Sequence, residues 1–139
     1  MLRSLSAVIA GVICSGLTFM IVTTIARSIY TRPEGILPDD KEALADYLSS
    51  QPTGEKLFLS VSLILSALLA SYIAARISDM YKFWIGLIGG FFMVMITVSI
   101  FLYLPYDKGY AAINILLVFL VIALGAKLGS KKSIRKAYK

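Results

Sequence analysis

The pattern of polar and apolar residues divides the chain into four long apolar segments. Residues 5–26, 57–75, 83–104 and 109–126 contain no Asp, Glu, Lys or Arg. At about 1.5 Å per residue, each segment would form a helix of roughly 27 to 33 Å, which matches a bilayer hydrocarbon core of about 30 Å. None alternates polar and apolar residues as a transmembrane strand does. We therefore predict an all-α integral membrane fold with four transmembrane helices, at about 5–27, 56–77, 83–104 and 109–128.

The one long polar segment lies between the first two apolar segments and reads "ILPDDKEALADYLSSQPTGEK" (36–56). Asp39 as N-cap would place Glu42 at the third helical position, as in a capping box. Pro52 and Gly54 are residues that end helices. The segment therefore predicts a short amphipathic extracytoplasmic helix at about 40–50, within a loop over 31–56.

This short helix would place Leu44, Tyr47 and Leu48 on one face. About eleven residues do not form a stable helix alone in water, so the helix needs support. It could lie on the membrane interface, cap the outer end of the bundle, or bind a partner. The candidate partner-binding residues are Asp39, Asp40, Glu42, Leu44, Tyr47 and Leu48.

Composition agrees with the hydropathy pattern. The 139 residues are 58% hydrophobic and only 16% charged, which is typical of an integral membrane protein and unlike a soluble domain. The length suits one domain, a single four-helix unit over 1–139. The first apolar segment is longer than the roughly 7 to 15 residues of a signal-peptide core, so we expect a retained helix.

The charged residues predict the orientation. If the helices alternate in direction, both termini and the 76–82 turn share one side, where Lys and Arg predominate and Asp79 is the only acidic residue. The positive-inside rule then predicts cytoplasmic termini in a bacterial inner membrane. The tail over 129–139 is expected to bind lipid headgroups rather than nucleic acid. Its candidate headgroup ligands are Lys131, Lys132, Arg135 and Lys136.

Small residues spaced four apart predict close contacts between helices. In lipid, such residues let helix backbones approach, because no hydrophobic effect drives apolar helices together there. The contacts could form within one chain or between chains. The candidate packing residues are Gly11, Ser15, Gly86, Gly90, Gly125 and Gly129, and the candidate intramembrane polar contacts are Asn114, Thr18 and Tyr72.

The chain offers few groups for catalysis or metal binding. It has no histidine, its single cysteine (Cys14) suits a packing role, and its apolar segments contain no acid or base. Transporters and pumps commonly carry an ionisable residue within the membrane. We therefore expect no enzymatic activity, no catalytic or metal-binding residues and no cofactor.

Two stretches in the first half of the chain carry a resemblance. "LPDDKEALADYLSSQPTGEKL" followed by a helix ending "ASYIAARIS" resembles a loosely defined group of small bacterial four-helix membrane proteins without an established activity. In that group a Pro- and Asp-rich outer loop joins the first two helices. The resemblance implies the four-helix architecture and a bacterial inner membrane, and it supplies no catalytic residues.

Three functions agree with these observations. The leading hypothesis is a non-enzymatic membrane protein that acts through helix packing, either as an accessory or assembly subunit of a membrane complex or as a small homo-oligomer. Its partners would be the lipid bilayer and other membrane chains or copies of itself. The alternatives are a minimal transporter or channel for a small neutral or apolar solute, and a holin-like or stress-related membrane factor.

Overall fold

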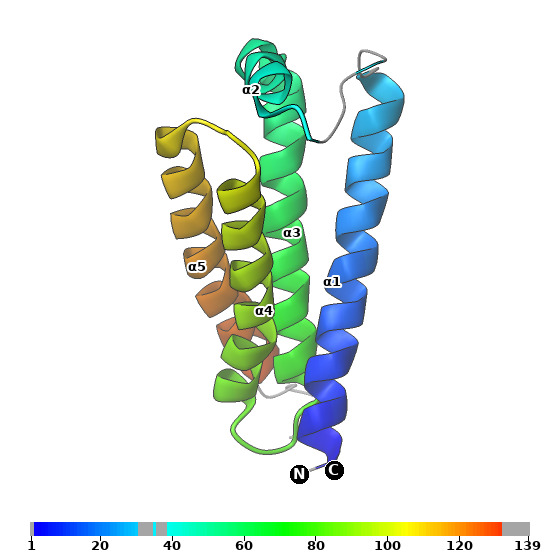
Figure 1. Ribbon diagram of the computed structural model, residues 1–139. Coiled ribbons are helices and arrows are strands. Elements are labelled where there is room, and N and C mark those ends of the chain that lie inside the picture. Colours follow the sequence, from blue (N-terminus) through cyan, green and yellow to red (C-terminus); the bar gives the residue numbers. More distant parts are fainter. Residues whose placement is uncertain (1, 31–34, 36–38, 132–139) are drawn as a thin grey trace.

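The structure, a computed structural model, describes residues 2–30, 35 and 39–131, and five helices lie within these ranges (Figure 1). They are α1 (Leu2–Ile29), α2 (Lys41–Ser50), α3 (Thr53–Ile77), α4 (Lys82–Tyr103) and α5 (Lys108–Ser130). The four long helices run alternately in opposite directions. The start of α1, the α3–α4 turn and the end of α5 share one end of the bundle, the terminal end, and α2 lies at the other, the α2 end.

The prediction of four long apolar helices is confirmed: α1, α3, α4 and α5 are each long and apolar enough to cross a membrane. Near the loop, the helix boundary that differs most from the prediction is the start of α3. Pro52 precedes this helix, and its carbonyl oxygen accepts hydrogen bonds from the amides of Glu55 (3.0 Å) and Lys56 (3.3 Å). Proline suits a helix start, so Thr53 and Gly54, which were expected in the loop, belong to α3.

The N-cap of α2 is Asp40, so the prediction of Asp39 was wrong by one residue. The Asp40 backbone is extended (φ −87°, ψ 91°), and its Oδ1 accepts a hydrogen bond from the Ala43 amide at 3.2 Å. Either of two adjacent aspartates can cap a helix, and the backbone conformation decides between them. Glu42 consequently does not occupy the capping-box position, although it remains in the first turn, where the helix dipole favours an acid.

Helix α3 packs against all three other long helices, whereas α1 and α5 lie on opposite sides of the α3–α4 pair and do not contact each other within the described residues. The buried face of α3 consists almost wholly of small side chains. Its members are Ser62, Leu63, Ser66, Ala67, Ala70, Ser71, Ala74 and Ala75. Such a face lets neighbouring helix backbones come close.

Glycines of the three neighbouring helices, α1, α4 and α5, contact this face of α3 in the terminal half of the bundle. A Cβ added to Gly11 of α1 would lie 2.6 Å from the Ala70 carbonyl oxygen, and one added to Gly89 of α4 would lie 2.6 Å from the Ala74 Cβ. From α5, a Cβ added to Gly129 would lie 2.5 Å from the Tyr72 carbonyl oxygen. Only glycine fits such separations without a shift of one helix.

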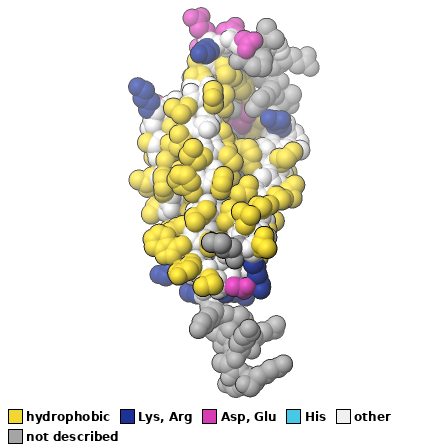
Figure 2. Space-filling model, turned by 60° about the horizontal axis from the view of Figure 1, so that its bottom comes forward, with side chains coloured by type: hydrophobic (Ala, Val, Ile, Leu, Met, Phe, Trp, Pro, Cys, Tyr) yellow, Lys and Arg dark blue, Asp and Glu magenta, His cyan; other side chains and the backbone are white. Residues whose placement is uncertain are grey.

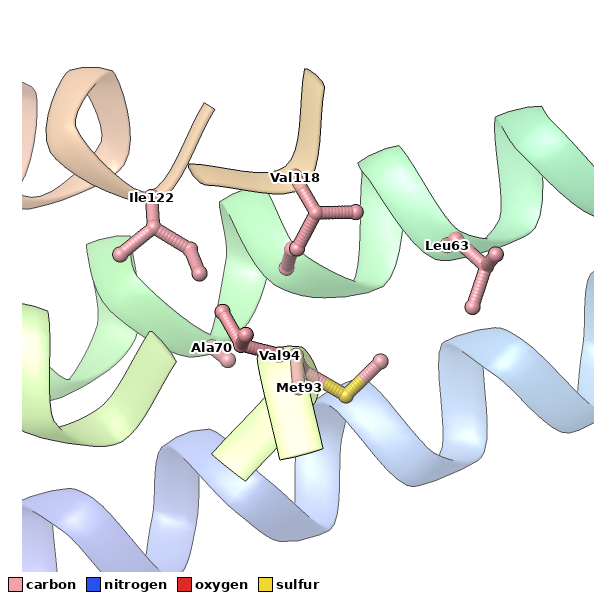
Figure 3. Packing of buried hydrophobic residues seen from close by; sticks show 7 residues of the cluster. Leu63, Ala70, Met93, Val94, Val118 and Ile122 are labelled. Carbon is pink, nitrogen blue, oxygen red and sulfur yellow. The ribbon is translucent and has the colours of Figure 1, made fainter. Parts of the chain in front are cut away.

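Larger apolar side chains fill the space between α3, α4 and α5 next to these contacts. Figure 3 shows Val94 of α4 and Val118 and Ile122 of α5 beside Ala70 of α3. Each of them is at most 5% exposed. The middle of the bundle is therefore filled with side chains.

The polar groups of the interior are almost all neutral hydroxyls, and no charged side chain is buried among the described residues. Most hydroxyls bond to a carbonyl of the preceding turn, as Thr97 does to Met93 (2.7 Å) and Ser15 does to Val12 (2.8 Å). Such bonds satisfy a hydroxyl inside its own helix and need no partner elsewhere.

Aromatic residues join the helices at the α2 end. The rings of Phe101, Tyr106 and Tyr110 pack with centroids 5.6 to 5.7 Å apart. The Tyr110 hydroxyl donates to the Lys56 carbonyl oxygen at 2.6 Å and lies 2.9 Å from the Ser60 hydroxyl oxygen. These contacts connect the end of α4 and the start of α5 to the start of α3.

Hydrophobic side chains cover the middle of the visible face of the molecule, and most charged side chains lie toward its two ends (Figure 2). At the terminal end, Arg3 of α1 forms an ion pair with Asp79 of the α3–α4 turn at 2.8 Å. Both side chains are more than half exposed, so the pair contributes little to stability. The bundle therefore has an apolar belt between two polar ends.

We predict that Gly11→Ala destabilises the bundle by about 1 to 3 kcal/mol, because the added methyl group overpacks the α1–α3 contact. Gly16→Ala, in the same helix, is the matched control, since no atom lies within 4 Å of its added Cβ. Thermal unfolding of both variants in one detergent measures the difference. Equal stability of the two variants would contradict the close contact at Gly11.

Candidate functional site at the α2 end

A cavity of about 240 Å³ lies at the α2 end between α1, α3 and the end of α4, and it is partly open to the outside. Apolar side chains form one part of its wall and polar ones the other. The apolar members are Phe19, Ala26, Leu59, Ile100 and Leu104. The polar members are Thr23, Arg27, Gln51, Glu55 and Tyr106.

Helix α1 forms one wall of the cavity. Its small residues contact α3 in the terminal half, and larger side chains follow toward the α2 end. In its terminal half, α1 turns Ala7, Gly11 and Ser15 toward the interior, and all three are buried. In the α2 half, α1 lines the cavity with Phe19 and Thr23, which are only partly buried, and then with the buried Ala26 and the exposed Arg27. The Thr23 hydroxyl donates to the Phe19 carbonyl oxygen at 2.7 Å, which leaves this part of the wall largely apolar.

Arg27 and Glu55 place opposite charges on the same cavity. Arg27 lies in the last turn of α1 and is exposed, and Glu55 lies in the first turn of α3 and is partly buried. Within the part of the chain that the structure describes, the only ion pair joins Arg3 to Asp79. Arg27 and Glu55 therefore line the cavity without pairing with each other.

The Glu55 carboxylate is held from α2. The Tyr47 hydroxyl donates to its two oxygens, at 3.2 and 3.3 Å. Gln51, the C-cap residue of α2, also lines the cavity, and its Oε1 is inaccessible to solvent and has no hydrogen-bond partner. A buried acceptor without a donor costs about 1 to 3 kcal/mol of stability.

Some of the candidate partner-binding residues of the α2 region are exposed, and others are covered. Asp39, Asp40 and Glu42 are exposed, whereas Leu48 is only 5% exposed. Leu44 and Tyr47 are partly buried, and Tyr47 bonds to Glu55. The apolar face of α2 is thus covered, and the acidic residues are the ones that face outward.

The candidate intramembrane polar residues do not come together. The Asn114 amide Nδ2 donates to the Tyr110 carbonyl oxygen at 2.9 Å, and the Thr18 hydroxyl donates to the Cys14 carbonyl oxygen at 2.8 Å, each within its own helix. Tyr72 is 38% exposed. None of the three lines the cavity. The Asn114 Oδ1 is buried and has no partner.

The candidate packing residues all lie at helix contacts. Gly11, Ser15, Gly86, Gly90, Gly125 and Gly129 are buried. Four of the five glycines meet residues of α3, and Gly90 packs on Ile122 of α5. Of the candidate headgroup residues, Lys131 is exposed and its carbonyl oxygen accepts a bond from Arg76 at 3.3 Å. Lys132, Arg135 and Lys136 lie outside the described residues.

Sequence reasoning did not find the cavity or its polar residues. The sequence patterns assigned no site role to Arg27 or Glu55. Their opposite signs at the facing ends of two helices joined by a long loop were the available signal. Gln51 carried no signal, because its role depends on how the α2–α3 junction folds over the cavity.

The chemistry of the cavity suits binding more than catalysis. Arg27 supplies hydrogen-bond donors and a positive charge, Glu55 supplies acceptors and a negative charge, and the remaining wall is apolar. Among the described residues, no group of three His, Cys, Asp or Glu side chains could hold a metal ion. Comparison with protein-family models, curated proteins and solved structures finds no match to this chain.

We predict that Tyr47→Phe loosens α2, because it removes the bonds that tie this ten-residue helix to Glu55. A hydrogen bond to a carboxylate at a partly exposed site is worth about 1 kcal/mol, so amide exchange across α2 should accelerate about fivefold. Ser49→Ala is the control, since the Ser49 hydroxyl bonds only within α2. Unchanged exchange in Tyr47→Phe would show that the bond does not support the helix.

Proposed function

We propose that the chain is a multi-pass protein of a bacterial inner membrane with both termini in the cytoplasm. Four helices of suitable length and apolarity support insertion. At the terminal end, the described charged residues other than Asp79 are basic: Arg3, Arg76, Lys82, Lys127 and Lys131. The α2 end carries the acidic residues of α2, together with Glu55 and Asp107. Positive charge on the cytoplasmic side supports this orientation.

The proposed orientation predicts which sites a membrane-impermeant thiol reagent reaches. In a Cys14→Ala background, Asp46→Cys should be labelled on intact spheroplasts, because α2 would lie outside the cytoplasm. Lys131→Cys should be labelled only after lysis. Both positions are exposed, so burial does not limit the reaction. The reverse labelling pattern would overturn the orientation.

Within that membrane we propose a non-enzymatic role through helix packing, as an accessory or assembly subunit of a membrane complex or as a small homo-oligomer. The observation that carries this proposal is the filled middle of the bundle. Small residues and apolar side chains occupy it, no charged side chain is buried among the described residues, and the cavity is confined to the α2 half. A filled interior disfavours passage of a solute through a single chain.

The exposed apolar surface also supports association with other chains. Helix α1 is the least buried of the long helices, and only its small-residue side meets the bundle. Ile9, Ile13, Leu17 and Met20 are each more than half exposed. Such a surface faces lipid or another transmembrane helix. On the polar side, Asp39, Glu42 and Asp46 are exposed and offer a partner outside the cytoplasm a cluster of acids.

The test extracts the protein from its own membrane in mild detergent and measures its mass by native mass spectrometry. We expect the mass of a complex with a defined second chain, or a fixed multiple of the mass of one chain. Deletion should then lower the amount of the partner complex. Joint replacement Asp39→Asn, Glu42→Gln and Asp46→Asn should weaken a partner bound at α2 and spare the N-cap Asp40. Lys41→Gln is the control on the same helix. A monomer whose loss leaves all membrane complexes intact would refute the packing role.

A further inference from the structure

An apolar groove on the outer surface of α4 borders the cavity at the α2 end. The groove shares Ile100 and Leu104 with the cavity and has a volume of about 430 Å³. Its other lining residues are Phe92, Met95, Ile96, Ser99 and Tyr103. The Ser99 hydroxyl already donates to the Met95 carbonyl oxygen at 2.8 Å, so the groove offers almost no free polar group.

The length of the groove matches one leaflet of a bilayer. From Phe92 to Tyr103 it follows α4 for about eleven residue steps, or roughly 16 Å along the helix. Half of a hydrocarbon core of about 30 Å is nearly the same length. A site that is polar at the membrane boundary and apolar over one leaflet matches the shape of a single phospholipid.

The polar groups of the cavity indicate which headgroup it would take. Arg27 can bind a phosphate, because its guanidinium group donates paired hydrogen bonds to two phosphate oxygens. The Glu55 carboxylate can accept hydrogen bonds from a primary ammonium group. One cation and one carboxylate on the same wall complement a zwitterion.

We propose that the cavity and the groove together bind one phospholipid with a phosphoethanolamine headgroup, its phosphate on Arg27, its ammonium on Glu55, and an acyl chain along α4. This assignment rests on the membrane placement proposed above and not on the accessory role. Choline lacks N–H donors for the Glu55 carboxylate, and a phosphoglycerol headgroup lacks the positive charge that Glu55 attracts.

The test uses the full chain reconstituted in vesicles of equal parts phosphatidylethanolamine, phosphatidylcholine and phosphatidylglycerol. After gentle extraction, native mass spectrometry counts the retained lipids. Phosphatidylethanolamine should be retained at least about fivefold over each of the other two, as expected from one lost charge-assisted hydrogen bond. Equal retention of the three lipids would overturn the proposal.

Variants assign the headgroup contacts. Arg27→Gln should lower phosphatidylethanolamine retention about tenfold, and Glu55→Gln should remove the preference over phosphatidylcholine. Lys108→Gln is the matched control, because Lys108 is exposed at the α2 end and lines neither the cavity nor the groove. If the control loses as much lipid as the cavity variants, the headgroup assignment is wrong.

The wild-type chain gives a readout that does not depend on the folding of variants. A phosphatidylethanolamine with a photoreactive acyl chain should label α4 between residues 92 and 103, and labelling spread evenly over all helices would contradict the groove. Soluble glycerophosphoethanolamine should not displace the lipid. Displacement at equal concentration would identify a soluble ligand and overturn the lipid assignment.

One further measurement separates the two proposals. Extraction of membranes with alkaline carbonate should leave the chain in the pellet. Release into the supernatant would refute the membrane placement and the lipid site together. A chain that stays in the membrane without a preference for phosphatidylethanolamine would refute only the lipid site.

Discussion

The close approach of three helices to the small-residue face of α3 is the contact on which the rest of the bundle depends. In a lipid environment apolar helices gain little from leaving their solvent, so their association relies on van der Waals contacts that weaken within about an ångström of separation. Gly11, Gly89 and Gly129 bring α1, α4 and α5 to the backbone or methyl groups of α3. One methyl group at any of them forces a helix outward.

The two halves of the bundle therefore differ in how closely α1 approaches α3. In the terminal half, glycine, alanine and serine bring the helices together and leave no room for a ligand. Toward the α2 end, Phe19 and Thr23 replace the small residues of α1, and the contact between α1 and α3 gives way to a cavity. Tyr30 closes the contact again at the very end, where it packs on Gly54 and, with ring centroids 6.1 Å apart, on Phe58.

Polar contacts at the α2 end also connect helix α2 to the cavity. The α2 helix is short, yet its Tyr47 hydroxyl reaches the Glu55 carboxylate, and its apolar Leu48 is covered. Helix α2 thus contacts the cavity wall at Glu55, while its acidic residues remain outside. The loop that looked like a separate binding element in the sequence is also part of the site formed by α1, α3 and α4.

The sequence by itself determined the number, type and approximate limits of the helices, because long charge-free segments and capping residues act locally. Small residues four apart share a helix face, and this spacing pointed to Gly11 and Gly129 but not to Gly89. Only the tertiary structure decided that Asp40 rather than Asp39 caps α2, and that the cavity is lined by Arg27, Gln51 and Glu55 and not by Asn114, Thr18 or Tyr72. Those outcomes depend on how segments far apart in the sequence pack together, and no local sequence pattern determines that packing.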